Sequence, residues 1–299
     1  MIKSGAVSTI TIDGSSAKFW FTSDIHFDSV YCDRKAFFSD MDEAVKQEAK
    51  ICIIGDLFDA LNGRVDPRRD MSLLRPEYRR PDYYDFVVSD TANKLEKYAE
   101  NIVLITPGNH ELSVLKFSNT YLSDRLVSQL NAKGGSVIHG AYGGWMRIKL
   151  VIANKIRGMV RVKYFHGSGG EAPVTRGAIQ TNRQAVYLPD ADIVVNGHSH
   201  HSYWIPVTRE RVSDVGVQYF DTQHYIRTPG YMNSYGDGTT GWGVTNGMVP
   251  KPMGGCFVTI HRVGNALKQC PIDINPVIHN PQPISPVNDI FNGTVFPQE

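Results

Sequence analysis

One local pattern occurs five times in this sequence: a short run of β-branched or apolar residues is followed at once by Gly, Asp, Asn or His. The five runs are FWFTSDIH (19–26), ICIIGD (51–56), NIVLITPGNH (101–110), KYFHG (163–167) and DIVVNGHSH (192–200). Each run predicts a buried strand whose carboxyl end opens into a polar loop. A chain with this pattern has to place several polar loops at strand ends.

Stretches with helical periodicity separate these runs. Residues 34–50 and 89–100 have apolar residues three or four positions apart with charged residues between them, as in amphipathic helices packed on a sheet. Alternating strands and helices predict an α/β fold, in which ligands bind at the carboxyl ends of the strands. We therefore expect the polar residues at the five strand ends to converge.

Composition limits the protein class. No run approaches the ~18 consecutive apolar residues of a membrane span, and the N-terminus lacks the pattern of a secretory signal. The four cysteines form no CxxC pair, which fits a reducing compartment, so we expect buried thiols and a cytoplasmic protein without a membrane partner. A formal net charge of +1 argues against nucleic-acid binding through global charge and leaves a local basic patch open.

We interpret residues 1–299 as a single domain with two unusual segments. An arginine-rich insertion at about 60–88 carries six arginines against three acids within residues 64–80. A glycine- and aromatic-rich segment at about 225–256 contains eight glycines and suits a structured loop bordering a site better than a helix. Residues 271–299, rich in Pro and Asn, predict no regular structure and a course over the surface.

The polar residues at the strand ends form a metal-ligand set. They are Asp24, His26, Asp56, Asp59, Asn109, His110, His166, His198 and His200. Carboxylate, imidazole and amide ligands together suit Mn, Fe, Zn or Co, whereas a structural zinc site more often uses thiolates. In D-x-H and H-x-H pairs at a strand end, both side chains can turn toward one point, and a preceding Gly permits the sharp departure from the strand.

Five short motifs occur in a fixed order: D-x-H (24–26), G-D-x-x-D (55–59), G-N-H-E (108–111), H-G (166–167) and G-H-x-H (197–200). Together they resemble those of the calcineurin-like metallophosphoesterases. The resemblance implies an α/β fold in which two mixed β-sheets pack as a sandwich flanked by helices. It also implies two divalent metal ions, for which we expect Mn²⁺, with Fe, Zn, Co and Ni as alternatives.

The resemblance also implies the role of each residue. The ligands implied for one ion are Asp24, His26, Asp56 and His200, and those for the other are Asp56, Asn109, His166 and His198. Asp56 would bridge the ions. His110 would contact the phosphate or protonate the leaving oxygen, and Asp59 would hydrogen-bond to His110 and hold its orientation. Two such ions, about 3.5–4 Å apart, can hold a hydroxide and clamp phosphate oxygens for in-line displacement.

The substrate is less constrained than the site. By motif, the chain is most similar to SbcD-like nucleases and to phage-encoded members, so we predict a phosphodiesterase acting on DNA, other nucleic acid or nucleotides. The alternatives are a phosphomonoesterase with a small-molecule or protein substrate, and a noncatalytic scaffold that keeps the fold as a binding surface.

Several residues keep a plain structural interpretation. Glu111 is expected to cap the helix that follows it, with support of the site as the alternative, and His201 is expected to face solvent or to support the ligands. Arg68, Arg69, Arg79 and Arg80 are read as a solvated surface, with a phosphate-contacting arm as the alternative.

Overall fold

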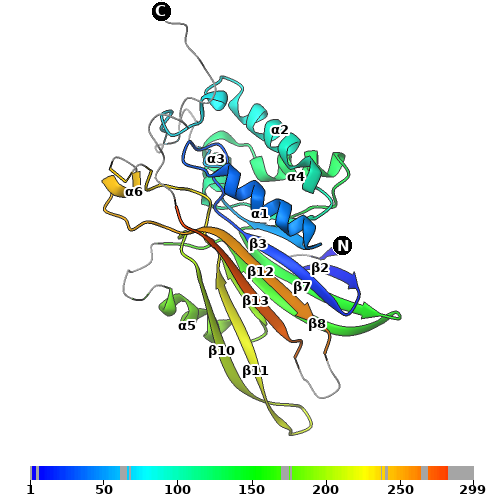
Figure 1. Cartoon of the computed structure of the whole chain (residues 1–299). Coiled ribbons are helices and arrows are strands. Elements are labelled where there is room, and N and C mark those ends of the chain that lie inside the picture. Colours follow the sequence, from blue (N-terminus) through cyan, green and yellow to red (C-terminus); the bar gives the residue numbers. More distant parts are fainter. Residues whose placement is uncertain are drawn as a thin grey trace, which may run out of the picture.

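A computed structural model describes the chain over residues 2–4, 7–60, 66, 69–169, 175, 177–236, 238–239, 242–263 and 269–281. Two mixed β-sheets pack against each other and helices flank them, which confirms the predicted fold (Figure 1).

The six-stranded sheet carries the first three predicted strands. Its order is β13 (Ile272–His279), β12 (Met253–His261), β3 (Ser16–Thr22), β4 (Lys50–Ile54), β5 (Ile102–Thr106) and β6 (Ile138–His139). Strands β3 to β6 run parallel to one another, whereas β12 is antiparallel to both of its neighbours, β3 and β13. The carboxyl ends of β3, β4 and β5 therefore lie at one edge of the sheet.

The seven-stranded sheet carries the other two. Its order is β1 (Ile2–Ser4), β2 (Val7–Asp13), β7 (Gly143–Ile152), β8 (Lys155–Phe165), β9 (Ile193–Asn196), β11 (Gln218–Arg227) and β10 (Tyr203–Val212). Strand β9 lies between β8 and β11 and is parallel to both, so the loops after β8 and β9 leave the sheet side by side.

The inner strands are buried on both faces, which explains their nearly continuous apolar sequences. Along β3, Phe19 and Phe21 pack between the two sheets, whereas Trp20 packs under the helical layer. Along β4, Cys52 and Ile54 point into the inter-sheet core. All four cysteines are buried free thiols, as predicted. A strand buried on both faces lacks the apolar–polar alternation of a half-exposed strand.

Helices cover the outer face of the six-stranded sheet (Figure 1). They are α1 (Arg34–Lys46), α2 (Tyr83–Leu95), α3 (Asn109–Ser118) and α4 (Leu122–Ala132), with short 3₁₀ turns η1 (Pro76–Tyr78) and η2 (Glu96–Tyr98). Helix α5 (Ala178–Tyr187) lies beside β10 and β11, and a four-residue helix, α6 (Trp242–Thr245), interrupts the glycine-rich segment.

The C-terminal segment differs from its prediction. Residues Ile272–His279 form β13, an edge strand antiparallel to β12, although Pro276 lies within it. Pro276 is tolerated because a proline without an N–H can occupy the open side of an edge strand. Residues 282–299 lie outside the described part of the chain.

Two arginines of the insertion, Arg75 and Arg79, hydrogen-bond to main-chain oxygens, whereas Arg69 is exposed. Arg75 donates to the main-chain oxygens of Ser29 and Cys32, at 2.9 and 2.6 Å, and Arg79 donates to that of Leu74, at 2.8 Å. Arg80 is exposed and pairs with Asp82. Arg64 and Arg68 lie outside the described residues.

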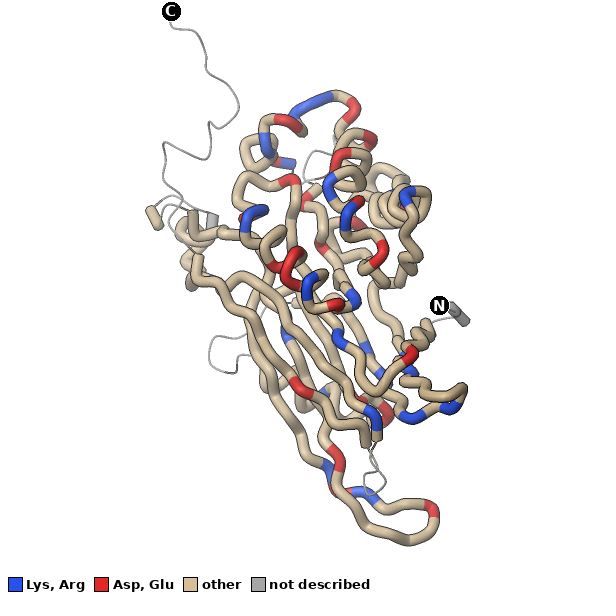
Figure 2. The backbone as a smooth tube through the Cα atoms, turned by 45° about the vertical axis from the view of Figure 1, so that its right-hand side comes forward, with Lys and Arg blue, Asp and Glu red and all other residues tan. Residues whose placement is uncertain are grey.

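Lysines and arginines are interspersed with acidic residues along the helical layer (Figure 2). Among the described helices, none has the length and apolar character needed to cross a membrane.

Candidate metal centre

The candidate ligands meet at the carboxyl ends of five strands. Asp24 and His26 follow β3, Asp56 follows β4, and Asn109 begins α3 just after β5. From the other sheet, His166 follows β8, and His198 and His200 follow β9. The edge that the sequence predicted as a point of convergence is thus built jointly by both sheets.

The ligand atoms form two adjoining groups. Asp24, His26 and His200 make one group and Asp56, His166 and His198 the other, and within each group the ligand atoms lie within 4.8 Å of one another. These groups correspond to the two ligand sets implied by the resemblance.

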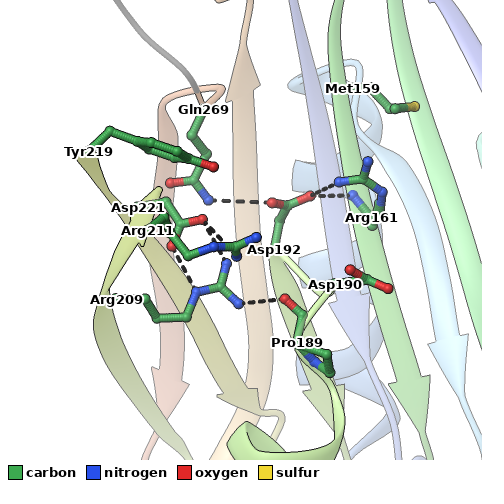
Figure 3. A pocket seen from close by; sticks show the side chains of 10 residues that line it. All are labelled: Met159, Arg161, Pro189, Asp190, Asp192, Arg209, Arg211, Tyr219, Asp221 and Gln269. Atoms are coloured by element: carbon green, nitrogen blue, oxygen red, sulfur yellow. Dashed lines mark hydrogen bonds and ion pairs between the residues drawn. The ribbon is translucent and has the colours of Figure 1, made fainter. Parts of the chain in front are cut away.

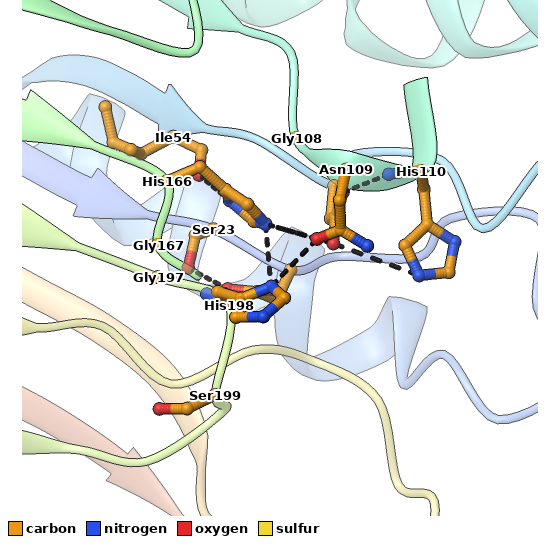
Figure 4. Close-up of polar contacts among 12 residues, drawn as sticks. Ser23, Ile54, Gly108, Asn109, His110, His166, Gly167, Gly197, His198 and Ser199 are labelled. Carbon is orange, nitrogen blue, oxygen red and sulfur yellow. Dashed lines mark hydrogen bonds and ion pairs between the residues drawn. The ribbon is translucent and has the colours of Figure 1, made fainter. Parts of the chain in front are cut away.

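Asn109 belongs to the second group (Figure 4). Its Oδ1 lies 2.8 Å from His198 Nδ1 and 3.2 Å from His166 Nε2. Asp56 Oδ2 lies 3.1 Å from His166 Nε2, and Asp24 Oδ1 lies 3.9 Å from the same nitrogen. The carboxylates of Asp24 and Asp56 therefore face the boundary between the two ligand groups, which is where a residue that bridges two ions has to lie.

The backbone at these positions is unusual. Five of the ten described non-glycine residues with positive φ are ligand candidates: Asp24 (52°), His26 (49°), Asp56 (47°), His198 (76°) and His200 (57°). A left-handed conformation costs a non-glycine residue about 1–2 kcal/mol. Such strain persists only where the surroundings hold it, and it gathers at functional sites.

Main-chain hydrogen bonds between loops hold this conformation. Beyond the end of the β3–β4 ladder, Asp24 N donates to Gly55 O at 3.0 Å and His26 N donates to Asp56 O at 3.1 Å. Gly108 packs directly against Asp56, because a Cβ at residue 108 would overlap the Asp56 carboxylate and main-chain nitrogen. The glycine of the G-N-H-E motif is thus required by a close approach to the candidate bridging residue.

Two buried atoms in the site indicate that it is built for an ion. Asp24 Oδ1 and His26 Nε2 are buried and have no hydrogen-bond partner. A buried polar atom without a partner costs about 1–3 kcal/mol, so native structures satisfy nearly all of them. Both atoms face the first ligand group, where a divalent cation would satisfy them, and the carboxylate, imidazole and amide donors around them suit such a cation.

Hydrogen bonds fix which nitrogen of each imidazole is available. His26 Nδ1 lies 3.0 Å from Asp59 Oδ1, and His166 Nδ1 lies 2.8 Å from the main-chain oxygen of Ile54. Both Nδ1 atoms therefore donate, so Nε2 is the nitrogen that points into the site and can offer a lone pair to a cation once it has lost its proton. Such partners commonly orient metal-binding histidines.

The site concentrates opposite charges. Burial lowers the pKa of His26 and His166, but Asp59 next to His26, and Asp56 and Asp24 next to His166, outweigh burial and raise these pKa values to about 9 and about 10. Burial lowers the pKa of His200 to about 4. Without metal, two protonated imidazoles thus balance the buried carboxylates, and cations would replace those protons.

Asp59 was expected to hydrogen-bond to His110 and hold its orientation, and the structure shows a different arrangement of the two side chains. The shortest contact between them joins His110 Nδ1 to the Asp59 main-chain oxygen at 2.6 Å, and the carboxylate is farther, at 3.4 Å. That carboxylate instead accepts the shorter hydrogen bond, from His26. Asp59 thus contacts both imidazoles and orients His26 with its side chain.

Glu111 does more than the predicted helix cap. Its carboxylate accepts from Gly108 N at 2.8 Å, as in a capping box, but also from Phe58 N at 2.9 Å and Asp56 N at 3.2 Å. It therefore ties the G-D-x-x-D loop to the start of α3. The sequence favoured the cap over a role in supporting the site, and it could not identify the other two partners, which lie more than 50 residues away.

Two further residues that support the loops of the site were not predicted from the sequence. Asp28 is fully buried and accepts from Asp59 N at 2.6 Å, from Ala60 N at 3.0 Å and from the Tyr83 hydroxyl. Arg227, buried at the end of β11, donates to Gly197 O at 2.6 Å and so supports the G-H-x-H turn. Asp28 in DIHFD gave a weak signal as an acid in an apolar run, and Arg227 gave none.

A cavity of about 710 Å³ opens onto the site. His26, Asp56, Asn109, His110, His198 and His200 line one side of it. The other lining residues include Asp70 and Leu73 from the insertion and Met232, Ser234, Met248 and Lys251 from the glycine-rich segment. Both unusual segments of the sequence therefore border the candidate metal centre. His201 also lines the cavity and contacts Lys251, although it was expected to face solvent or support the ligands.

A second cavity, of about 310 Å³, lies among β8, β10 and β11 (Figure 3). Arginine and aspartate side chains pair within it: Arg209 donates to both carboxylate oxygens of Asp221, at 2.7 and 2.9 Å, and Arg161 Nη1 lies 3.9 Å from Asp192 Oδ2. These charges offset each other, and the cavity contains none of the candidate ligands.

Comparisons with known proteins agree with this arrangement. A family model described as calcineurin-like phosphoesterase matches residues 17–202, which include every candidate ligand. No curated protein matches the chain.

Solved structures show only distant likeness. Thermotoga maritima protein TM1076 is 11% identical with a TM-score of 0.29, covering 87% of this chain and 99% of that chain. Vps29 of Chaetomium thermophilum, complexed with a cyclic peptide, is 10% identical with a TM-score of 0.29, covering 90% and 100%. GAP50, the anchor in the inner membrane complex of Plasmodium, is 11% identical with a TM-score of 0.35, covering 93% of each chain.

Proposed function

Because the chain belongs to the calcineurin-like phosphoesterase family, we propose that it is a dinuclear metal-dependent phosphodiesterase acting on nucleotides or nucleic acid. The observation that carries this proposal is the pair of ligand groups opening into one cavity beside His110. We also propose Mn²⁺ as the resident ion, since carboxylate, amide and imidazole ligands suit it.

The protein’s own residues would hold and orient the reacting groups. When bound, two divalent ions would supply Lewis-acid stabilisation of a phosphate and acidify a water molecule. Asp56, facing both ligand groups, would fix their separation. Asn109 contributes a neutral oxygen, which adds a ligand without adding negative charge beside an anionic substrate.

His110 is placed to act as the acid. Its Nδ1 donates to the Asp59 main-chain oxygen, so the transferable proton stands on Nε2, 3.9 Å from Asp56 Oδ2. The side chain is 17% exposed and lines the cavity, where it can reach a leaving-group oxygen. General acid catalysis contributes about 10²–10⁴-fold. His110→Asn should lower kcat by that factor while leaving metal content unchanged.

The proposal is tested with metal-loaded wild-type protein and four substrates: bis-p-nitrophenyl phosphate, p-nitrophenyl phosphate, single-stranded DNA and double-stranded DNA. A phosphodiesterase hydrolyses the diester faster than the monoester. Turnover of p-nitrophenyl phosphate alone would replace the proposal with its second candidate.

That second candidate is a phosphomonoesterase, and Lys251 is the observation that favours it. Its ammonium lies in the wall of the same cavity and can offset the additional charge of a monoester dianion. Lys251→Met would then lower monoester turnover more than diester turnover. Equal losses for both esters argue against this candidate.

A further inference from the structure

Three large apolar side chains line the cavity and form what we call its apolar wall: Leu73 from the insertion, and Met232 and Met248 from the glycine-rich segment. Met248 is 38% exposed, a notable fraction for a large apolar side chain beside a polar centre. Leu73 lies within the residues that the family model matches, whereas both methionines lie beyond them, in a part of the chain that the family motifs do not define.

The wall carries little positive charge. Among the described residues lining the cavity, Lys251 is the one lysine, and no arginine lines it. Arg75, Arg79 and Arg80 of the insertion bond elsewhere, to main-chain oxygens or to Asp82. A surface that follows a nucleic-acid strand combines several lysines or arginines along the phosphates with stacking aromatics. Neither pattern is present among the described residues that line the cavity.

The size of the cavity matches one small ligand. Pockets for small molecules hold about 300–1,000 Å³ and are lined mainly by apolar side chains with a few polar groups that fix orientation. The volume of the cavity, about 710 Å³, falls within this range, and Leu73, Met232 and Met248 supply apolar contacts beside its polar groups. Methionine is well suited to such contacts, because its flexible thioether contacts aromatic rings favourably.

We propose that this wall, formed by Leu73, Met232 and Met248, binds a planar apolar group of a small phosphodiester, an aryl ring or a nucleobase, while the phosphate lies at the metal centre. The inference rests on the proposed function and narrows its substrate from nucleic acid and nucleotides to small esters. The wall thus sets specificity for the ester group that is not expelled.

Three substrates that share one leaving group and one negative charge test the wall: methyl, phenyl and thymidine 5′-p-nitrophenyl phosphate. For metal-loaded wild type, kcat/KM for the ring-bearing esters should exceed that for the methyl ester about tenfold or more, as expected when a ring leaves water for an apolar wall. Comparing the phenyl and thymidine esters distinguishes an aryl ring from a nucleobase.

Matched variants locate the effect. Met248→Ser should reduce the preference for ring-bearing esters several-fold, whereas Met248→Leu, which keeps the apolar volume, should retain it. Met159→Ser is the control, since Met159 is similarly exposed, at 37%, but lines the second cavity. Equal kcat/KM for the three esters, or a preference that survives both Met232→Ser and Met248→Ser, overturns the inference while leaving phosphodiesterase activity intact.

A polymer substrate gives a different result. A single-stranded oligonucleotide that competes strongly with the methyl ester, with a steep dependence on salt, would overturn the small-ester inference. If no ester is hydrolysed, the proposed function fails, and calorimetric binding of phenyl phosphate and methyl phosphate to metal-loaded protein still decides the inference. Tighter binding of phenyl phosphate that is lost in Met248→Ser supports the wall, and equal affinities refute it.

Discussion

Glu111→Gln tests whether a carboxylate that binds no ion organises the metal centre. Glu111 Oε2 accepts from Gly108 N and Asp56 N, and Oε1 accepts from Phe58 N. Glutamine has the same shape but one carbonyl oxygen, so in either orientation its NH₂ group faces at least one main-chain N–H. The substitution therefore removes a charge-assisted hydrogen bond and sets two donors against each other.

The magnitude follows from these contacts. A hydrogen bond to a charged group contributes about 1.5–3 kcal/mol. Burial and the nearby Asp56 charge raise the pKa of Glu111, so the ionised carboxylate is itself costly at this position. Because Glu111→Gln removes this buried charge, part of the lost hydrogen-bond energy is offset. We therefore expect the unfolding free energy to fall by an amount near the lower end of the 1.5–3 kcal/mol range. Displacement of the Asp56 main chain should also weaken metal binding.

Urea unfolding of metal-free protein, followed by tryptophan fluorescence, measures the stability loss, and titration calorimetry with Mn²⁺ measures the affinity. Glu96→Gln is the matched control, because Glu96 is 53% exposed and pairs with Lys133 at the surface. Surface pairs contribute about 0–1 kcal/mol. If Glu111→Gln unfolds like the control and binds Mn²⁺ like wild type, Glu111 is only a helix cap and the reasoning is refuted.

Three other perturbations have defined outcomes. Asp56→Asn should lower the Mn²⁺ content of the purified protein, whereas His201→Ala should leave it unchanged; equal metal content in the two variants would remove Asp56 from its bridging role. Gly108→Ala should destabilise the protein by about 1–3 kcal/mol, the usual cost of overpacking, because the new methyl group overlaps Asp56; wild-type stability in urea would show that the loop can move away. The raised pKa values of His26 and His166, about 9 and about 10, exceed the unfolded value, so their contribution to metal-free stability is complete below about pH 6.5 and is lost as pH rises through 9–10. Metal binding near pH 7 should therefore release about two protons, which calorimetry in buffers of different ionisation enthalpy detects; no dependence on the buffer would contradict these protonation states.

The sequence predicted the fold class and the strand ends because these depend on local pattern. Apolar runs ending in Gly, Asp or His identified β3, β4, β5, β8 and β9. The β10–β11 hairpin was not recognised, although β10 alternates between half-buried and exposed residues along its length. Its half-buried positions include Arg209 and Arg211 and its exposed positions include Trp204 and Val212, so the hydropathy along the strand does not follow the burial. Strand β13 was missed because its pairing with β12 overrides the irregular sequence around Pro276.

The candidate ligands could be predicted, whereas the residues that hold them could not. Motif residues such as Asp24 and His26 can be recognised by their chemical type and spacing. Asp28, Glu111 and Arg227 bind main-chain atoms of distant residues, and because every residue has these atoms, the sequence does not show which ones are bound. The apolar wall of the cavity could not be predicted for a related reason, since Leu73 and Met248 lie far apart in the sequence and line the same cavity only in the folded chain.

The central claim is that seven side chains from five strand ends form one dinuclear centre. Metal content together with electron paramagnetic resonance of Mn²⁺-reconstituted protein tests it most directly. We predict two ions per chain with the exchange-coupled spectrum of a closely spaced pair. One ion per chain, none, or two ions with the spectra of isolated Mn²⁺ would contradict it.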